Sequence, residues 1–264
     1  MKTALVTGAS SGIGEAFARE LASQKTDLVL VARSQEKLER LATELSSKYQ
    51  VKTEVIVRDL TEAAAGQAVF DAVRAKGLTI DLLINNAGFG DYGAFSDRPL
   101  SKQLAMVQLN ITAVVELTGL FLPLMQQRKD GAIINVSSIA AFQPTPYLSV
   151  YAATKAFILN FSEALWAENK DRGVRILVAC PGPTESQFYD RADFPDSATG
   201  LNKMTMASTE KVVRETLSAL DKSQSTVVAG GFANQIIANL PRLLPRDVLV
   251  NVVGKQFDIL PSLK

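Results

Sequence analysis

A tyrosine and a lysine stand four residues apart in the run Tyr151-Ala152-Ala153-Thr154-Lys155. If the segment is helical, the phenol and the ammonium lie on one face, because residues four apart are neighbours on a helix. A free phenol has a pKa of about 10, and for proton transfer near pH 7 that pKa must fall by about 3, worth roughly 4 kcal/mol. A nearby ammonium acts in that direction by stabilising the phenolate. The pair is typical of acid/base chemistry, yet Tyr-x-x-x-Lys is also an ordinary coincidence on helix surfaces.

The chain contains no histidine and a single cysteine, Cys180. The missing imidazole excludes Ser-His-Asp and Cys-His nucleophilic schemes and nearly all histidine-bearing metal sites. One cysteine excludes an intrachain disulfide and a cysteine-ligated zinc cluster, and Cys180 is interpreted as a buried small residue that ends a strand. We therefore expect no metal site, and proton transfer near neutrality must use a perturbed Tyr, Lys, Asp, Glu or Cys.

Length and charge favour one soluble domain over residues 1–264. No linker or charge run divides the 264 residues, of which 47% are hydrophobic. The 28 Lys and Arg balance 27 Asp and Glu, which leaves no global field to attract nucleic acid or an anionic membrane. A glycine at position 8 leaves no room for a signal-peptide apolar region, and no later stretch is expected to span a bilayer. The expected setting is cytoplasmic.

Short apolar runs alternate with longer segments of helical periodicity. The runs span residues 4–7, 28–31, 54–57, 82–84, 133–136, 175–179 and 226–229. The helical segments span residues 16–23, 35–46, 63–75, 102–125, 152–168 and 210–220. Such alternation predicts an α/β fold with a doubly wound parallel sheet of about seven strands and helices on both faces. Ligands bind such sheets beyond the carboxyl ends of the strands.

Three glycines follow the first apolar run in Thr7-Gly8-Ala9-Ser10-Ser11-Gly12-Ile13-Gly14. Glycines at a strand-to-helix turn let backbone N–H groups approach a pyrophosphate, and the dipole of the next helix favours the anion. The spacing departs from the dinucleotide-binding pattern G-x-G-x-x-G, and a turn without a ligand is the alternative. Because the turn follows the first strand, we predict dinucleotide contacts at Gly8, Ser10, Ser11, Gly12, Ile13 and Gly14.

The second run ends in Arg33, at a place where an acidic residue would favour NAD. A guanidinium pairs with a 2′-phosphate through two N–H groups, so Arg33 predicts NADP as the cofactor. Alternatively, Arg33 and Lys37 are solvated charges at a helix start, although cations there oppose the helix dipole. After the third run, Asp59 and Leu60 are expected beside the adenine, with Asp59 accepting from its amino group or capping the next helix beside Thr61.

These motifs and their order resemble the short-chain dehydrogenase/reductase family over most of the chain. The matching segments are Thr7-Gly8-(three residues)-Gly12-Ile13-Gly14, Asn85-Asn86-Ala87-Gly88, Asn110, Ser137-Ser138, Tyr151-(three residues)-Lys155 and Pro181-Gly182. The resemblance implies a single Rossmann-type domain. It also implies an NADPH-dependent oxidoreductase that reduces a ketone or aldehyde, or oxidises the corresponding alcohol.

The resemblance assigns catalytic roles to four residues. Ser138 donates to the substrate carbonyl oxygen and Tyr151 protonates that oxygen during reduction; Ser137 is the neighbour that could be mistaken for Ser138. Lys155 lowers the pKa of Tyr151 and binds the nicotinamide ribose, so both residues border the cofactor. Asn110 holds a water that links Lys155 to solvent, or else is a buried asparagine bonded to helix backbone.

Two further segments are assigned to the cofactor by the resemblance. Asn85, Asn86, Ala87 and Gly88 line the adenosine side and tie the central sheet. Pro181, Gly182, Thr184 and Ser186 follow the sixth run, and Thr184 and Ser186 replace the valine and threonine of the family pattern. The Thr184 backbone is expected to anchor the carboxamide, and the Ser186 hydroxyl a phosphate.

The substrate site is expected at residues 187–206, which contain Phe188, Tyr189 and Phe194, and at Phe142, Pro146 and Tyr147. These residues predict an apolar or aromatic pocket for a lipophilic ketone or aldehyde, a steroid-like compound or a 3-oxoacyl compound. Many tetrameric members have Asp-Gly-Gly after the last strand, whereas this chain has Ala229-Gly230-Gly231 and then a tail, residues 232–264. Its apolar part is expected to be core, a dimer contact or a lid, and a homodimer is favoured over that style of tetramer.

Two other functions stay open at this point. A regulatory or scaffolding protein that binds the dinucleotide without turnover would have the same fold, although it would tolerate loss of Ser138, Tyr151 or Lys155. An epimerase or dehydratase with the same tyrosine would need a larger substrate domain than 264 residues provide.

Overall fold

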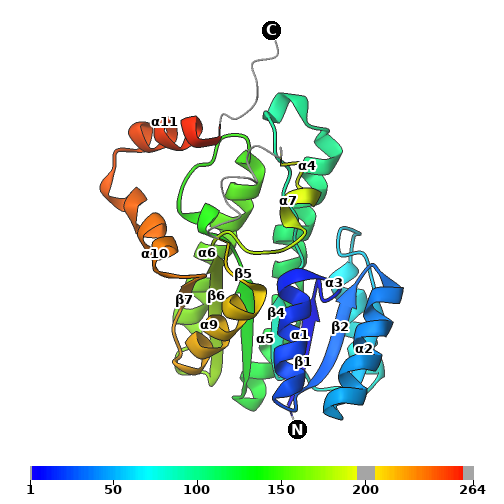
Figure 1. The fold of residues 1–264 in the computed structure, drawn as a ribbon. Coiled ribbons are helices and arrows are strands. Elements are labelled where there is room, and N and C mark those ends of the chain that lie inside the picture. Colours follow the sequence, from blue (N-terminus) through cyan, green and yellow to red (C-terminus); the bar gives the residue numbers. More distant parts are fainter. Residues whose placement is uncertain (1, 195–205, 258–264) are drawn as a thin grey trace.

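The computed structural model describes residues 2–194 and 206–257, within which seven parallel strands form one sheet (Figure 1). The strands are β1 (Thr3–Thr7), β2 (Asp27–Ala32), β3 (Thr53–Val57), β4 (Leu82–Asn85), β5 (Gly131–Val136), β6 (Val174–Pro181) and β7 (Thr226–Ala229). Their order in the sheet is β3-β2-β1-β4-β5-β6-β7, so the winding reverses between β1 and β4. The predicted doubly wound parallel sheet is confirmed, and the reversal marks where such sheets bind ligands.

Helices connect the strands on both faces of the sheet. They are α1 (Gly12–Ser23), α2 (Gln35–Tyr49), α3 (Ala65–Ala75), α4 (Leu100–Val107), α5 (Ala113–Arg128), α6 (Ser149–Asn169), α7 (Phe188–Arg191), α9 (Thr209–Asp221), α10 (Phe232–Asn239) and α11 (Arg246–Phe257). Short 3-10 helices form η1 (Phe95–Asp97), η3 (Ile139–Phe142) and η4 (Leu240–Leu243), and a π-helical turn forms η2 (Gln108–Thr112). The helix expected over 63–75 begins two residues later, because the chain turns at 61–64.

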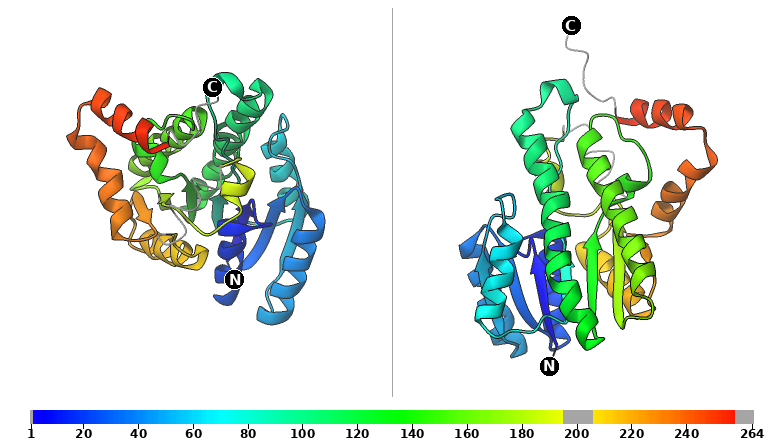
Figure 2. Two further views of the ribbon diagram at one scale, coloured as in Figure 1. Left: turned by 45° about the horizontal axis from the view of Figure 1, so that its top comes forward. Right: turned by 180° about the vertical axis from the view of Figure 1, so that it is seen from behind.

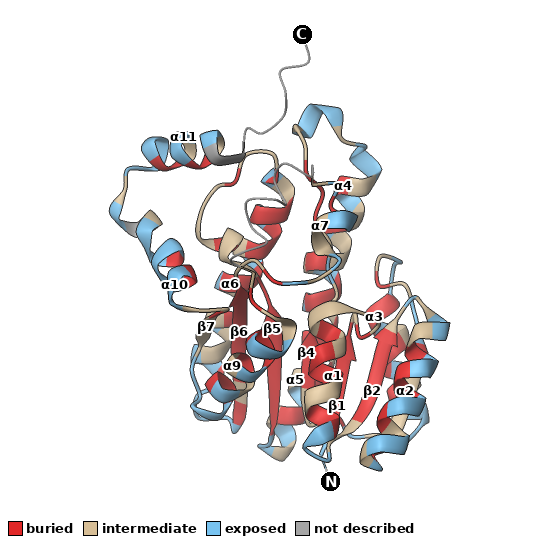
Figure 3. Cartoon of the chain, viewed as in Figure 1, coloured by how far each residue is buried: buried red, intermediate tan, exposed pale blue. Residues whose placement is uncertain are grey.

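Alternate strand residues pack into two separate helical layers. Val6 and Leu30 face α1, α2 and α9, whereas Leu5 and Val29 face the layer that contains α3 and α5 (Figure 2). Helix α6 covers the β6 part of that second face through Ile158. Both sheet faces are therefore buried while the outer helix surfaces are exposed (Figure 3), which explains why the strand sequences are apolar without alternation.

Helices α4 and α5 are joined through η2 into 29 helical residues, Leu100–Arg128. The best 18-residue window has a mean hydropathy of 1.6, so by length and composition alone this helix is long and apolar enough to cross a membrane. A core helix passes the same test, so the expectation that no stretch spans a bilayer stays a prediction. The apolar side chains have a packing role in the fold, because Leu117, Phe121 and Met125 of α5 are buried against the sheet.

The C-terminal segment forms α10, η4 and α11, of which α10 lies beside the carboxyl end of β7 and α11 lies farther from the sheet (Figure 1). The sequence predicted apolar surface here but no helices. Ala238, Leu249 and Val253 are buried, whereas Leu243 is 81% exposed and Phe232 is 74% exposed. The segment therefore rests on the body of the protein along one side and presents apolar side chains on the other. Residues 258–264 of the predicted tail lie outside the described residues.

Candidate active site

Tyr151 and Ser138 meet at the carboxyl end of β5. Tyr151 is the third residue of α6 and only 8% exposed, and its phenol lies within reach of the Ser138 side chain. The Ala140 N–H donates to Ser138 Oγ at 3.1 Å, which fixes the orientation of that hydroxyl. Ser137 points elsewhere, since its Oγ donates to the Lys155 carbonyl at 2.7 Å. The structure thus places Ser138, and not Ser137, against the phenol.

Lys155 follows one helical turn after Tyr151 and is also buried. Its Nζ donates to the Val136 carbonyl at 3.0 Å and lies 5.7 Å from the centroid of the Tyr151 ring. The helical spacing predicted from the sequence is therefore realised. Burial disfavours the ammonium and lowers the pKa of Lys155 to about 8.

The pKa of Tyr151 departs from the sequence-based expectation. Burial of the phenol raises its pKa above the ordinary value of 10, and the hydrogen bond with Ser138 lowers it only in part. The expected lowering by Lys155 is not found in the chain by itself, because the phenol is desolvated and the ammonium is bonded to the Val136 carbonyl. Tyr151 is consequently protonated at neutral pH, as a proton donor must be.

Asn110 lies in the π-helical turn η2, directly beside Lys155. Its Nδ2 donates to the Phe89 carbonyl at 3.0 Å and to Thr154 Oγ1 at 3.1 Å, and its Oδ1 accepts from the Phe89 N–H at 3.2 Å. The predicted alternative of a bond to helix backbone is therefore wrong, since Phe89 belongs to the loop after β4. A Cβ on Gly88 would stand 2.9 Å from Asn110 Oδ1 and 3.4 Å from Lys155 Nζ. The glycine lets this loop approach both side chains.

The glycine turn between β1 and α1 is locked against the loop after β4. Gly8 and Gly12 have φ of +67° and +57°, a region that side chains rarely adopt. A Cβ on Gly14 would lie 2.3 Å from the Gly8 carbonyl oxygen, so only glycine fits. Thr7 Oγ1 accepts from the N–H groups of Asn86 at 2.9 Å and Ala87 at 3.0 Å. These hydrogen bonds hold the end of β1 against the loop after β4.

The other predicted contact residues of the glycine turn are Ser10, Ser11 and Ile13, and all three are half-buried. Ser11 precedes α1 without a side-chain cap. Ile13 packs against Ala207 and against Val212 of α9. A Cβ on Gly12 would stand 3.3 Å from Cβ of Ser186, so the predicted phosphate residues of two distant segments are neighbours in the structure.

Arg33 and Asp59 are neighbours at the ends of β2 and β3. Arg33 is 72% exposed, and its Nη1 lies 3.6 Å from Asp59 Oδ2. Asp59 Oδ1 accepts from the N–H of Thr61 at 2.9 Å and from its Oγ1 at 2.8 Å, but in a turn and not as the cap of α3, which follows Ala64. Partial burial opposes ionisation of Asp59, yet the Thr61 hydrogen bonds and the Arg33 charge hold its pKa below the ordinary range. Leu60 is buried next to them.

Asn85 belongs to a chain of polar side chains inside the sheet. Its Nδ2 donates to Thr118 Oγ1 at 3.1 Å and to Asn135 Oδ1 at 2.9 Å, and Asn135 Nδ2 donates to Ser162 Oγ at 2.9 Å. These contacts tie β4 and β5 to α5 and α6. Asn135 was not predicted from the sequence, although an asparagine within an apolar run was the available signal. Asn85 therefore acts as the predicted tie of the central sheet.

Asn234 of α10 packs against the segment after β6. This residue was not predicted from the sequence. A Cβ on Gly182 would overlap Asn234 Nδ2 at 2.1 Å, and that amide donates to the Ala229 carbonyl at 3.1 Å. Thr184 is buried, and its Oγ1 donates to the Gly182 carbonyl at 2.8 Å. Ser186 Oγ accepts from the Phe188 N–H at 3.3 Å. Pro181 ends β6 directly before this turn.

Aromatic rings gather around Tyr151. The Phe188 ring centroid lies 5.2 Å from that of Tyr151, and Phe194 stacks at 4.8 Å from Tyr92, a residue that the sequence analysis missed. Tyr189 contacts both Phe188 and Phe194, and burial raises its pKa to about 12. The predicted aromatic lining is thus assembled around the phenol.

Two of the three other predicted lining residues, Phe142 and Pro146, lie away from the aromatic group, which corrects the prediction for them. Phe142 packs with Ile158 and Cys180 beneath the site, and Cys180 is fully buried, with burial raising its thiol pKa to about 12. Pro146 faces α11, because a Cβ on Gly254 would lie 3.5 Å from it. Tyr147 does join the aromatic group, 6.0 Å from Tyr92. Residues 195–205 of the predicted substrate segment lie outside the described residues.

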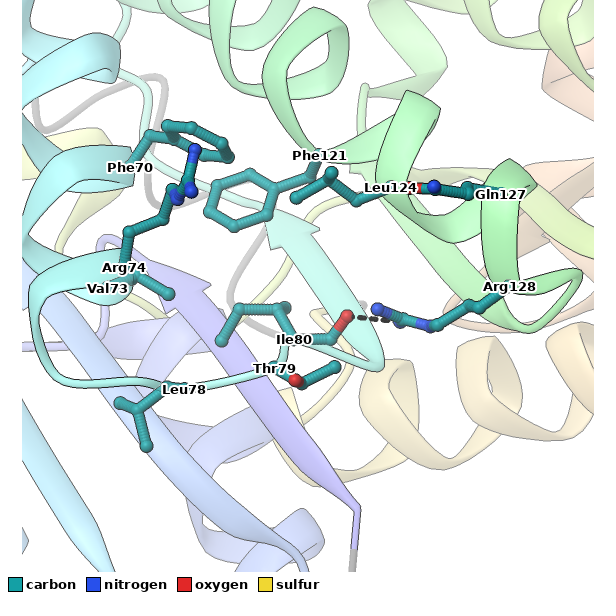
Figure 4. Close-up of a pocket in the computed structure, with 10 residues that line it drawn as sticks. All are labelled: Phe70, Val73, Arg74, Leu78, Thr79, Ile80, Phe121, Leu124, Gln127 and Arg128. Atoms are coloured by element: carbon teal, nitrogen blue, oxygen red, sulfur yellow. Dashed lines mark hydrogen bonds between the residues drawn. The ribbon is translucent and has the colours of Figure 1, made fainter.

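A separate cavity of about 340 Å³ lies between α3 and α5 (Figure 4). Phe70, Phe121 and Ile80 line its apolar wall, and Arg128 crosses its edge to donate to the Ile80 carbonyl at 2.5 Å. Ile80 lies two residues before β4, so the cavity is at the amino end of the sheet. It contains none of the candidate residues, all of which gather at the carboxyl end.

Comparison with known proteins adds an independent observation. A family model described as short chain dehydrogenase matches residues 2–193. The very-long-chain 3-oxoacyl-CoA reductase of Anas platyrhynchos is 39% identical over 268 residues, covering 96% of this chain and 78% of that protein. The 17-beta-hydroxysteroid dehydrogenase type 3 of Mus musculus is 32% identical, covering 96% of this chain and 80% of that protein. The short-chain dehydrogenase from Sphingobium yanoikuyae in complex with NADPH superposes with a TM-score of 0.80 at 33% identity, covering 86% of this chain and 87% of that one.

Proposed function

Because the chain belongs to the short-chain dehydrogenase family, we propose that it is an NADPH-dependent reductase of lipophilic ketones or aldehydes, with Tyr151 as the proton donor. The buried phenol of Tyr151, with the half-buried Ser138 hydroxyl beside it at the carboxyl end of β5, is the observation that carries the proposal. A hydroxyl donor and a protonated phenol at one point are suited to a carbonyl oxygen that gains negative charge.

The glycine turn supports a dinucleotide in this site. Side chains are absent where the backbone must come close, at Gly8, Gly12, Gly14 and Gly88. The glycine turn leads directly into the amino end of α1. Helix amino ends favour phosphate through free N–H groups and the helix dipole. A nicotinamide dinucleotide, when bound, supplies the hydride.

The chain's own residues supply the proton that the substrate oxygen receives. Tyr151 gives its proton to the substrate oxygen, while Ser138 holds that oxygen by a hydrogen bond. The phenolate that results is stabilised by Ser138, and the Lys155 ammonium lies 5.7 Å from the centroid of the same ring. Lys155, whose burial lowers its pKa to about 8, is matched to resupplying a proton near neutral pH. Asn110 positions the Phe89 loop beside Lys155.

Arg33 supports NADP as the preferred cofactor. It extends from the end of β2 into solvent, where its guanidinium can pair with a 2′-phosphate, and no acidic residue takes its position. Asp59, 3.6 Å away, neutralises part of the charge and orients the side chain. The Sphingobium yanoikuyae enzyme, which carries NADPH, supports the same choice.

The aromatic group around Tyr151 supports a lipophilic substrate. Phe188, Phe194 and Tyr92 form an apolar wall next to the proton donor. Relatives named for 3-oxoacyl-CoA and 17-beta-hydroxysteroid act on lipophilic compounds of this kind. A 3-oxoacyl or steroid-like ketone is therefore the substrate class that we propose.

A homodimer is also part of the proposal. Leu100, Leu104 and Phe157 expose apolar side chains on α4 and α6, and Phe157 lies at the hollow between these helices. Burial of such a face against a second copy would remove it from water. Sedimentation of the purified protein gives the mass of the assembly.

The decisive experiment replaces Tyr151 by phenylalanine. NADPH oxidation is followed optically against a panel of ketones, aldehydes and 3-oxoacyl thioesters. We expect Tyr151→Phe to lower turnover by at least about 100-fold, the usual size of a lost general acid, while NADPH still binds. Tyr49→Phe, on the remote helix α2, is the matched control and should keep full activity.

Two results would speak against this mechanism. Full turnover by Tyr151→Phe would remove the tyrosine from the reaction. Dinucleotide binding without turnover of any carbonyl by the unaltered protein would instead support the regulatory or scaffolding alternative.

A further inference from the structure

A salt-bridge cluster of Asp91, Arg98, Lys102 and Asp193 lies beside the aromatic wall. The Asp91 side chain is fully buried and accepts from Arg98 Nε at 2.8 Å, with Lys102 Nζ 2.6 Å from its Oδ1. Gln103 Nε2 donates to the same carboxylate at 2.5 Å. All these partners come from residues 91–103, so this half of the cluster fastens the loop after β4 to the start of α4.

Asp193 completes the cluster from a distant part of the chain. Its Oδ2 accepts from Arg98 Nη2 at 2.5 Å and from Lys102 Nζ at 2.8 Å. Asp91 alone would leave two cations facing one carboxylate, and the surplus positive charge attracts Asp193. Lys102 and Arg98 accordingly hold the pKa of Asp193 below its usual range. Asp193 is 53% exposed and thus is not held by burial.

Asp193 ends the short turn that begins with Phe188. The Phe188 carbonyl accepts from the Ala192 N–H at 2.9 Å, and the Ala192 carbonyl accepts from the Tyr92 N–H at 2.7 Å. Asp193 then adopts φ of +56°, which reverses the chain after the turn. The Phe188 ring reaches Tyr151 over Gly90, where a Cβ would stand 2.7 Å from Phe188 Cζ. The salt bridges and the ring are therefore at opposite ends of one hydrogen-bonded turn.

We propose that Asp193, held by Arg98 and Lys102, is a positioning residue that sets the width of the substrate site by keeping Phe188 against Tyr151. The proposal rests on the proposed function for its substrate class, a lipophilic carbonyl. When the salt bridges are intact, Phe188 limits the space beside the phenol, and a slender ketone contacts the ring. When they are lost, the slender ketone loses that contact and a bulky ketone gains room. Asp193 itself touches neither substrate nor cofactor.

The test compares Asp193→Asn with Asp190→Asn. Asparagine keeps the preference for positive φ and removes the charge, and Asp190 is an exposed carboxylate of the same turn without a resolved salt bridge. We expect hydrogen exchange of residues 188–194 to rise about two- to fivefold in Asp193→Asn, the usual strength of a partly exposed ion pair. Asp190→Asn should exchange like the unaltered protein.

Kinetics test the consequence for specificity. The KM for a slender ketone should rise about two- to fivefold in Asp193→Asn, with kcat little changed and with a smaller effect on a bulky ketone. Added salt should raise the KM of the unaltered protein, because salt screens the exposed ion pair, but leave that of Asp193→Asn flat. Lys102→Met should also raise the KM for the slender ketone. The double variant Lys102→Met with Asp193→Asn should raise that KM little more than the stronger of the two single changes.

Exchange and kinetics separate this proposal from the proposed function. Unchanged exchange in Asp193→Asn would overturn the positioning role, whether or not the protein reduces a carbonyl. Raised exchange with an unchanged or lower KM for the slender ketone would overturn the role in specificity. A protein that turned over no carbonyl would contradict the proposed function, and exchange, measured without substrate, would still decide whether Asp193 holds the turn.

Discussion

Replacement of Lys155 by methionine should stabilise the protein at neutral pH while removing its activity. Lys155 is 5% exposed and has no carboxylate among its resolved contacts, and burial lowers its pKa from 10.5 to about 8. A difference of about 2.5 pH units corresponds to about 3 kcal/mol of destabilisation when the residue is charged in both states. Methionine keeps the length of the side chain and loses the hydrogen bond to the Val136 carbonyl, which costs about 1 kcal/mol. The expected net gain at pH 7 is about 2 kcal/mol.

The gain should depend on pH in a defined direction. Below pH 8 the lysine is protonated in the folded and the unfolded chain, so the whole penalty of burying the charge is present. Between pH 8 and 10.5 the folded chain gives up the proton first, and the unaltered protein becomes more stable relative to the variant. The advantage of Lys155→Met should therefore shrink, and then reverse by about 1 kcal/mol, as the pH rises above 10.5.

Urea unfolding of the protein without added dinucleotide measures this effect. The free energy of unfolding is compared at pH 7 and pH 10 for the unaltered protein, Lys155→Met and the exposed control Lys222→Met. Lys222→Met should differ little from the unaltered protein at either pH. A Lys155→Met variant that is less stable than the unaltered protein at pH 7, or whose difference does not change with pH, would refute the reasoning.

Two further predictions concern the cofactor site. Arg33→Asp should weaken NADPH binding relative to NADH binding by about tenfold, which is measured as the ratio of the two Kd values. This is the size of one charge-assisted contact, reduced because Arg33 is 72% exposed. An unchanged ratio would remove Arg33 from cofactor selection. Gly14→Ala should lower Tm and abolish dinucleotide binding, because its Cβ would meet the Gly8 carbonyl oxygen at 2.3 Å. Gly119→Ala, where nothing lies within 4 Å, should instead stabilise α5 by about 1 kcal/mol, and equal effects of the two changes would contradict the steric argument.

The sheet and the active-site pair could be predicted because their signals are local. Each strand is an apolar run long enough to be recognised alone, and Tyr151 and Lys155 are one helical turn apart. Ser138 required the family resemblance, since two serines are adjacent and only the folded chain shows that Ser137 bonds to the Lys155 carbonyl. The pKa of Tyr151 was not predictable, because it depends on how fully the phenol is buried.

Contacts between distant segments were the ones that sequence reasoning missed. Asp193 lies 95 residues from Arg98, and neither residue has a neighbour in the sequence that indicates the pair. Asn234 closes on Gly182 in the same way. The helices α10 and α11 were missed because Pro241 and Pro245 interrupt the periodicity between them.

The interior position of β1, between β2 and β4, determines when the fold can form during synthesis. Its neighbours are β2, which emerges soon afterwards, and β4, whose residues are made about 80 positions later. Until then one edge of β1 has no strand to pair with, and Thr7 lacks the N–H groups of Asn86 and Ala87. The ribosome must therefore release residues 82–87 before the first βαβ units gain their final partner. An exposed edge of apolar parallel strands in that interval is where a nascent chain of this protein is most prone to aggregate.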